Sequence, residues 1–86
     1  MSAQPHALST ATQLGLLLQT SRKARKLTQA ALATQVGLSQ SRVSHLEQHA
    51  GQMSLDQLLN WCAVLGLELT LGPRPERHDI MSATDW

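Results

Sequence analysis

Apolar residues recur at helical spacing through most of the chain, and a Ser or Thr stands before each run. The four runs that this pattern marks as helices span 10–25, 28–37, 39–48 and 54–66. Two of them open with the capping-box pattern, in which a Ser or Thr is followed three residues later by Gln, at Thr10 and Ser54. Gly37 and Gly66 stand where a left-handed residue ends a helix. The pattern predicts a mainly α-helical bundle of four to five helices.

The period of the pattern changes after Gly66. Leu67, Leu69 and Leu71 alternate with polar residues, and this alternation predicts a short strand over 67–72. The sequence offers no second strand, and unpaired backbone groups need partners, so a second copy of the same strand is the economical source. We expect a homodimer joined by an antiparallel two-stranded ribbon. The alternative is an extended segment that packs on the helices of its own chain.

The chain has 86 residues, which is enough for one small domain. We expect a flexible arm over 1–8, a helical domain over 9–66, the dimerisation strand over 67–72 and a disordered tail over 73–86. The tail carries Pro, charged and small residues without periodicity and ends at Trp86. That terminal Trp is either a docking or degradation element or simply the last residue of the chain.

Composition excludes several classes of protein. Aromatic residues make up only 2% of the chain, against 42% for all apolar residues, so Leu, Ala and Val must fill the core. The single cysteine, Cys62, forms no internal disulfide, and no secretory leader or long apolar run is present, so we expect a cytoplasmic protein. We find no phosphate loop, paired-carboxylate motif or nucleophile elbow. We therefore expect neither an enzyme nor a cofactor.

The net charge of +1 hides an asymmetry between the two halves of the chain. Residues 1–53 carry five basic residues and one acidic residue, which gives +4, whereas residues 54–86 carry two basic and five acidic residues, which gives −3. The N-terminal half could approach a polyanion. The basic stretch over 22–26 is equally consistent with an ordinary solvated helix face.

The segment 29–48, QAALATQVGLSQSRVSHLEQ, satisfies the steric demands of two short helices that cross at a tight turn. Ala33 is small where the helices approach, and Gly37 permits the turn between them. The inner faces are supplied by Leu32, Val36, Leu38, Val43 and Leu46. The third helix carries amide, hydroxyl and imidazole groups on its other faces instead of the Glu and Lys mixture of a merely solvated helix. Two helices that serve only the packing of a bundle are the alternative.

Over residues 10–66 the chain resembles the phage-repressor-like (Xre) helix-turn-helix family. The resemblance implies that the third helix enters the major groove of double-stranded DNA. The residues that it then assigns to base readout are Gln40, Ser41, Ser44 and His45. The residues that it assigns to phosphate binding are Gln29, Ser39, Arg42 and Lys26. Gln40 is the first candidate for readout, because its amide can pair bidentately with adenine.

The order of parts narrows the resemblance further. The chain resembles the HipB-type antitoxins, which are the DNA-binding partners of HipA-like serine/threonine kinase toxins. The segments similar in character to that family are ATQLGLLL, KLTQAALATQVGLSQSRVSHLE and LGLELTLG. The resemblance implies a dimeric repressor that autoregulates its operon at palindromic operators on the bacterial nucleoid. The resemblance does not predict the operator sequence, because the third helix departs from the family at Ser39, Arg42 and His45. A transcriptional regulator without a toxin, or an interaction module that has lost DNA binding, are the alternatives.

Four further side chains could have a functional or a structural role. Trp61 either covers a dimer contact, beside Leu67, Leu69 and Leu71, or packs in the core. His45 and His49 are four residues apart, but no third ligand stands beside them, so we expect a surface pair and no metal. Cys62 lies on the apolar stripe of the fourth helix, where we expect a small core residue.

Overall fold

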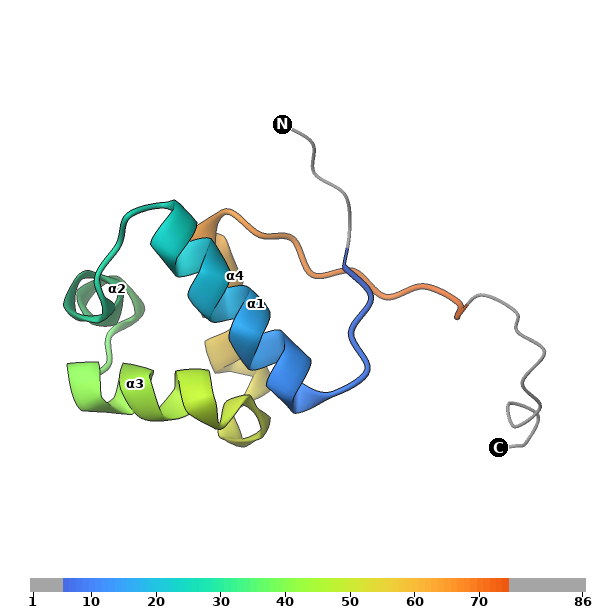
Figure 1. Ribbon diagram of the computed structural model, residues 1–86, viewed down its shortest axis with the longest axis horizontal. Coiled ribbons are helices and arrows are strands. Elements are labelled where there is room, and N and C mark those ends of the chain that lie inside the picture. Colours follow the sequence, from blue (N-terminus) through green and yellow to red (C-terminus); the bar gives the residue numbers. More distant parts are fainter. Residues whose placement is uncertain (1–5, 75–86) are drawn as a thin grey trace.

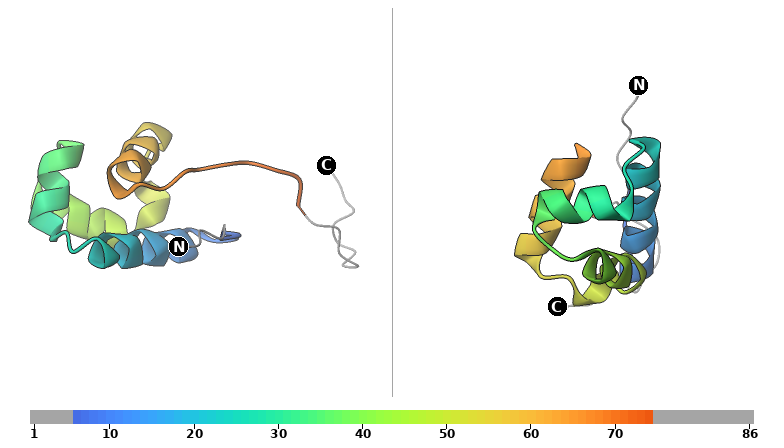
Figure 2. Two further views of the ribbon diagram at one scale, coloured as in Figure 1. Left: turned by 90° about the horizontal axis from the view of Figure 1, so that it is seen from above. Right: turned by 90° about the vertical axis from the view of Figure 1, so that its left-hand side faces the viewer.

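Four α-helices and one 3-10 turn form the part of the chain that the computed structural model describes, residues 6–74 (Figure 1). The elements are α1 (Ala11–Ala24), α2 (Gln29–Val36), α3 (Gln40–Gln48), η1 (Ala50–Gln52) and α4 (Leu55–Leu65). α1 crosses over the other helices, α2 and α3 meet at one end of the bundle, and α4 packs on α1 and α2 (Figures 1 and 2). The mainly helical prediction is confirmed. None of the helices within residues 6–74 is long and apolar enough to cross a bilayer.

Each helix begins at the cap that the sequence predicts. Thr10 and Ser54 both form complete capping boxes, in which the hydroxyl accepts from the N3 amide and the N3 Gln side chain accepts from the cap amide. Gly37 and Gly66 end α2 and α4 in the left-handed region, at φ 76° and φ 73°. Local chemistry therefore sets these ends. The turn η1 is an addition that the apolar pattern did not predict.

The core lies where all four helices meet. Five side chains are fully buried, and they come from every helix: Leu18, Leu32, Val43, Leu46 and Trp61. Val36 and Leu38 pack against this cluster from the edge. The predicted inner faces of α2 and α3 are thus confirmed, and together they hold the two short helices in one orientation.

Of the two interpretations of Trp61, the structure bears out core packing and contradicts the dimer contact, and it leaves part of the apolar stripe of α4 exposed. Trp61 is 0% exposed in the core, so its side chain offers no surface to a second copy. The predicted apolar stripe of α4 is only partly buried, because Leu55 is 64% and Leu59 is 47% exposed while Cys62 and Leu65 are buried. α4 therefore contacts the core through Trp61, Cys62 and Leu65, while Leu55 and Leu59 remain on the surface.

The strand predicted over 67–72 is not formed in the single chain, and residues 6–74 contain no strand at all. The segment runs away from the bundle on the side opposite α2 (Figure 1). Leu67 packs against the core, whereas Leu69 and Leu71 are exposed. A ladder needs a second strand, and this part of the chain supplies none.

α1 and α3 approach each other closely at Gly15. A Cβ atom on Gly15 would lie 2.5 Å from the backbone oxygen of Glu47, so only glycine fits there without movement. This contact brings the first half of α1 against the end of α3. It fixes the distance between the two helices at one point.

A buried ion pair fixes the same two helices at a second point. Arg22 Nε donates to Glu47 Oε2 at 2.6 Å and Arg22 Nη2 donates to Glu47 Oε1 at 3.1 Å. Arg22 is 6% and Glu47 5% exposed. Arg22 Nη1 also donates to the carbonyl of Leu27, at 2.9 Å, in the segment that joins α1 to α2. One guanidinium therefore ties α1 to α3 and to the entry of α2.

We expect Arg22→Ala to lower the free energy of unfolding by about 3–5 kcal/mol, because the Glu47 carboxylate would stay buried without its partner. The double variant Arg22→Met with Glu47→Leu removes both charges and should recover most of that loss. Lys23→Met, on the exposed neighbour, should stay within about 0.5 kcal/mol of the parent. Urea unfolding followed by circular dichroism measures all three. A double variant less stable than Arg22→Ala would contradict this role of the pair.

Candidate nucleic-acid interface

α3 has one side in the core and one side in solvent. Val43, Leu46 and Glu47 are buried, and they occupy a single arc of the helix. Because successive residues turn by about 100°, the opposite arc carries Ser41, Ser44, His45 and Gln48. Gln40 is exposed because it opens the helix, although it precedes Val43 by three residues and Glu47 by seven and so starts the line that becomes buried further along. Three of the four residues predicted to read bases, Ser41, Ser44 and His45, therefore lie on the outward side, and Gln40 is exposed at the start of α3.

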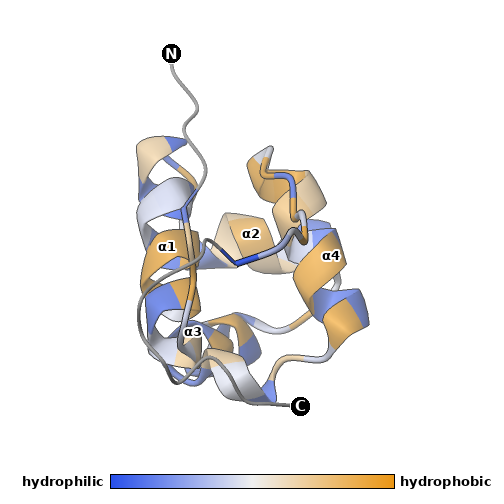
Figure 3. Ribbon diagram, turned by 90° about the vertical axis from the view of Figure 1, so that its right-hand side faces the viewer, coloured by the Kyte–Doolittle hydropathy of each residue, from blue (hydrophilic) through white to orange (hydrophobic). Residues whose placement is uncertain are grey.

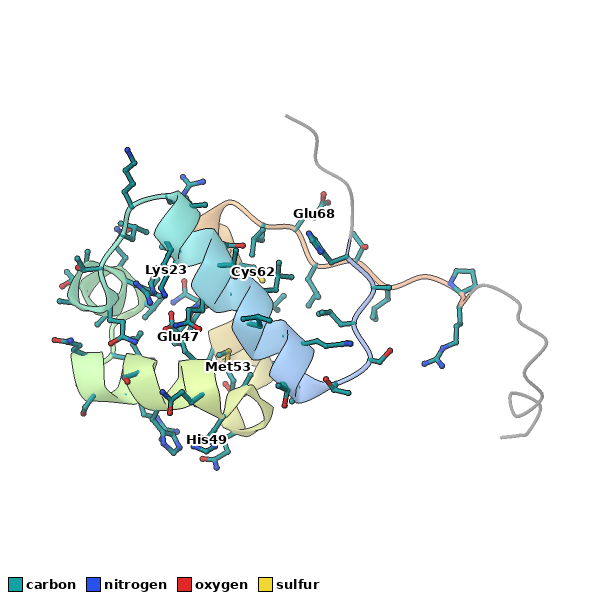
Figure 4. The ribbon with its side chains drawn as sticks, viewed as in Figure 1. Lys23, Glu47, His49, Met53, Cys62 and Glu68 are labelled. Atoms are coloured by element: carbon teal, nitrogen blue, oxygen red, sulfur yellow. The ribbon has the colours of Figure 1, made fainter. Side chains whose placement is uncertain are left out.

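Gln48 is a member of this arc that the sequence analysis missed. It is exposed and follows Ser44 by four residues and Ser41 by seven, which places it on the same line along the helix. The helical period alone could have identified it. The outward arc, with Gln40, consists of hydroxyl, amide and imidazole groups and contains no carboxylate, because the acid of α3, Glu47, points into the bundle (Figure 4).

The residues predicted to bind phosphate begin α2 and α3. Gln29 is half-buried at the first position of α2, and its Nε2 donates to Glu47 Oε1 at 3.1 Å. One amide proton of Gln29 is thereby committed to the buried ion pair, which fixes the orientation of the side chain. Ser39 caps α3, because its Oγ accepts from the Arg42 amide at 3.1 Å. Arg42 itself is exposed.

The four basic residues over 22–26 fall into two groups: two arginines that hydrogen-bond to other parts of the bundle and two exposed lysines. Arg22 is buried in its ion pair, and Arg25 Nη1 donates to the Leu65 carbonyl at 3.2 Å at the end of α4. Lys23 and Lys26 are exposed. Lys26 has φ 60°, a left-handed conformation that costs a side-chain-bearing residue of the order of 1 kcal/mol or more. The turn from α1 into α2 therefore presents a lysine where glycine would be less strained.

Of the remaining predicted site residues, the structure describes His45, Leu69 and Leu71. His45 is half-buried, with Nε2 2.9 Å from Gln52 Oε1, so its ring leans toward η1. Leu69 is 39% and Leu71 96% exposed. Both belong to the segment that follows α4, which passes in front of the helices in the view of Figure 3. Trp86 lies outside the described residues.

Two further observations concern metal ligands and the single cysteine. Residues 6–74 contain no group of three side chains that could hold a metal ion. Burial raises the pKa of the Cys62 thiol, so the thiolate that a nucleophile needs is disfavoured. The interpretation of Cys62 as a core residue is confirmed.

A comparison with protein families identifies a family for most of the chain. The family described as a helix-turn-helix domain matches residues 1–72, which includes all four helices and the segment after α4. No curated protein matches the chain.

Proposed function

Because the chain belongs to the helix-turn-helix domain family, we propose that it is a sequence-specific transcriptional repressor that reads DNA with α3. The observation that carries the proposal is the acid-free outward arc of α3. Gln40, Ser41 and Ser44 present short donors and acceptors on a helix narrow enough for the major groove. The single acid of α3 is held inside by Arg22, so no carboxylate repels the duplex from this arc.

Phosphate contacts would fix the position of α3 in the groove. Gln29 keeps one amide proton free at the start of α2, where backbone amides also point outward. Lys26 and Arg42 are the exposed cations nearest in sequence to the starts of α2 and α3. The Ser39 hydroxyl, which accepts in the cap, can still donate to a phosphate oxygen. These contacts carry affinity, whereas the contacts of Gln40, Ser41, Ser44 and His45 carry sequence preference.

We also propose that the repressor acts as a homodimer joined through residues 67–72. Leu69 and Leu71 are exposed and alternate with polar residues, and the backbone beside them has no strand partner within residues 6–74. A second copy of the segment would supply hydrogen-bond partners for the backbone and would cover the exposed leucines. Such a particle requires palindromic operators with half-sites about 34 Å apart.

The resemblance to HipB-type antitoxins supports a finer proposal, in which the repressor neutralises a HipA-like kinase toxin and autoregulates their operon. Residues 54–86 carry a formal charge of −3 against +4 for residues 1–53, so the part of the sequence that would bind a basic partner differs in charge from the part that would face DNA. Trp86 would serve as an aromatic anchor for docking or as a degradation signal. A regulator without a toxin is the competing function, and the absence of a kinase gene beside this one would favour it.

We expect Gln40→Ala to weaken binding to a duplex selected from random sequences by about 1–3 kcal/mol, with little effect on unselected DNA. Lys26→Gly is the matched control: glycine tolerates the left-handed turn, so the fold is kept while one cation is lost. It should weaken binding to both duplexes alike and reduce the slope of log K against log salt by about 1. Fluorescence anisotropy over a salt series measures both. Equal losses on both duplexes for Gln40→Ala would remove Gln40 from base readout.

Light scattering should find two copies of the chain per particle. Leu69→Lys combined with Leu71→Lys should give single copies that remain folded, because both side chains are exposed in the single chain. Leu16→Lys is the control: Leu16 is 63% exposed on α1, and its replacement should leave the dimer intact. A wild-type particle that contains one copy would overturn the dimer.

A chain that ends at Thr84 tests the role of Trp86. We expect it to bind the neighbouring kinase more weakly in a pull-down or to persist longer in cells than the full chain. The variant Trp86→Ala should reproduce whichever effect is seen. Unchanged kinase binding together with unchanged turnover would rule out Trp86 both as a docking element and as a degradation signal.

A further inference from the structure

Two histidines form a stacked pair at the end of α3. His45 and His49 lie four residues apart, and their ring centroids are 4.6 Å apart with an interplanar angle of 32°. His45 Nε2 is 2.9 Å from Gln52 Oε1, which ties the pair to η1. His49 projects from the side of α3 opposite to Glu47 (Figure 4). The pair therefore faces outward at the end of the proposed reading helix.

No acid within the described residues offsets the charge of this pair. The only ion pair within 4 Å in residues 6–74 joins Arg22 to Glu47, so no carboxylate oxygen lies that close to either imidazole. On α3 itself the other charged residues are Arg42, which is exposed, and Glu47, which is buried on the opposite side.

The parts of η1 and α1 that lie beside the pair carry no titratable group. η1 consists of Ala50, Gly51 and Gln52, and the first turn of α1 places Ala11 and Thr12 in the same shallow cleft as His49. Asp56 is the first acid along the chain after η1, and it is not within 4 Å of either ring. A proton bound here is therefore not neutralised by the protein.

Imidazole is the side chain that ordinarily changes charge between pH 5 and 8. The two rings lie side by side on the outward side of α3, where a phosphate could approach both of them. His45 Nε2 lies within hydrogen-bond distance of Gln52 Oε1, whereas its Nδ1 has no hydrogen-bond partner within residues 6–74. The phosphates of a bound duplex would favour the protonated rings.

We propose that the His45–His49 pair is a proton-linked phosphate contact, through which binding of DNA takes up protons from solvent onto the ring nitrogens. The inference rests on the proposed function, since it assumes that α3 lies against a duplex. By linkage, affinity for DNA rises as pH falls. The pair adds His49 to the interface and gives His45 a role beside base readout.

The experiment measures DNA affinity between pH 5.5 and pH 8 at constant ionic strength, with a chelator present so that metal bridging of the pair cannot contribute. One proton taken up per chain makes affinity rise by up to about tenfold for each unit that the pH falls. His45→Gln with His49→Gln should flatten this slope, while glutamine keeps a polar contact with Gln52. His6→Gln with His78→Gln removes the other two histidines of the chain and should keep the slope.

A second readout separates proton uptake from a change in folding. In the free protein and in the complex, the ring resonances of His45 and His49 are followed against pH, and both rings should stay protonated to higher pH in the complex. A flat pH dependence in the wild type, or a slope that survives in the His45→Gln, His49→Gln chain, would overturn the inference and leave the repressor intact. Absence of saturable binding at every pH would overturn both.

Discussion

The buried pair of Arg22 and Glu47 is the interaction on which the arrangement of the helices depends. A charged pair inside a small domain costs desolvation, and it persists here because both carboxylate oxygens and all three guanidinium nitrogens have partners. Those partners lie on α1, on α3 and at both ends of the segment that leads into α2. Helices of eight and nine residues are too short to be stable alone, so their orientation must come from such tertiary contacts.

The same pair determines the chemistry of the outer surface. Glu47 is the only acid in the first 53 residues, and its carboxylate is turned inward and neutralised. The outward arc of α3 is thereby left with hydroxyl, amide and imidazole groups. Gln29 takes its orientation from the same carboxylate, so one buried group positions both the helix that would read bases and a side chain that would bind phosphate.

Local signals made the helices predictable from the sequence, whereas the long-range contacts could not be predicted. Thr10, Ser54, Gly37 and Gly66 act within one turn of their own positions, so the sequence marks their helices directly. Arg22 and Glu47 are 25 residues apart and meet only because α1 crosses α3, and sequence spacing carries no sign of this.

The errors in the second half of the chain have the same origin. The inward position of Trp61 depends on how much space α4 leaves against α1 and α2, which a single helical stripe does not reveal. No strand forms over 67–72, because a strand ladder needs a partner and residues 6–74 supply none. The outward arc of α3, by contrast, follows from its helical period, which also marks Gln48 as a neighbour of Ser44.

The central claim is that the outward arc of α3 meets DNA while the opposite face of the bundle does not. Titration of the isotope-labelled protein with a duplex selected from random sequences, followed by amide resonances, tests this most directly. The account predicts saturable shifts at Gln40, Ser41 and Ser44 and at the side-chain amide of Gln29, with α4 at Leu55 and Leu59 unaffected. Shifts centred on α4, or none along α3, would contradict it.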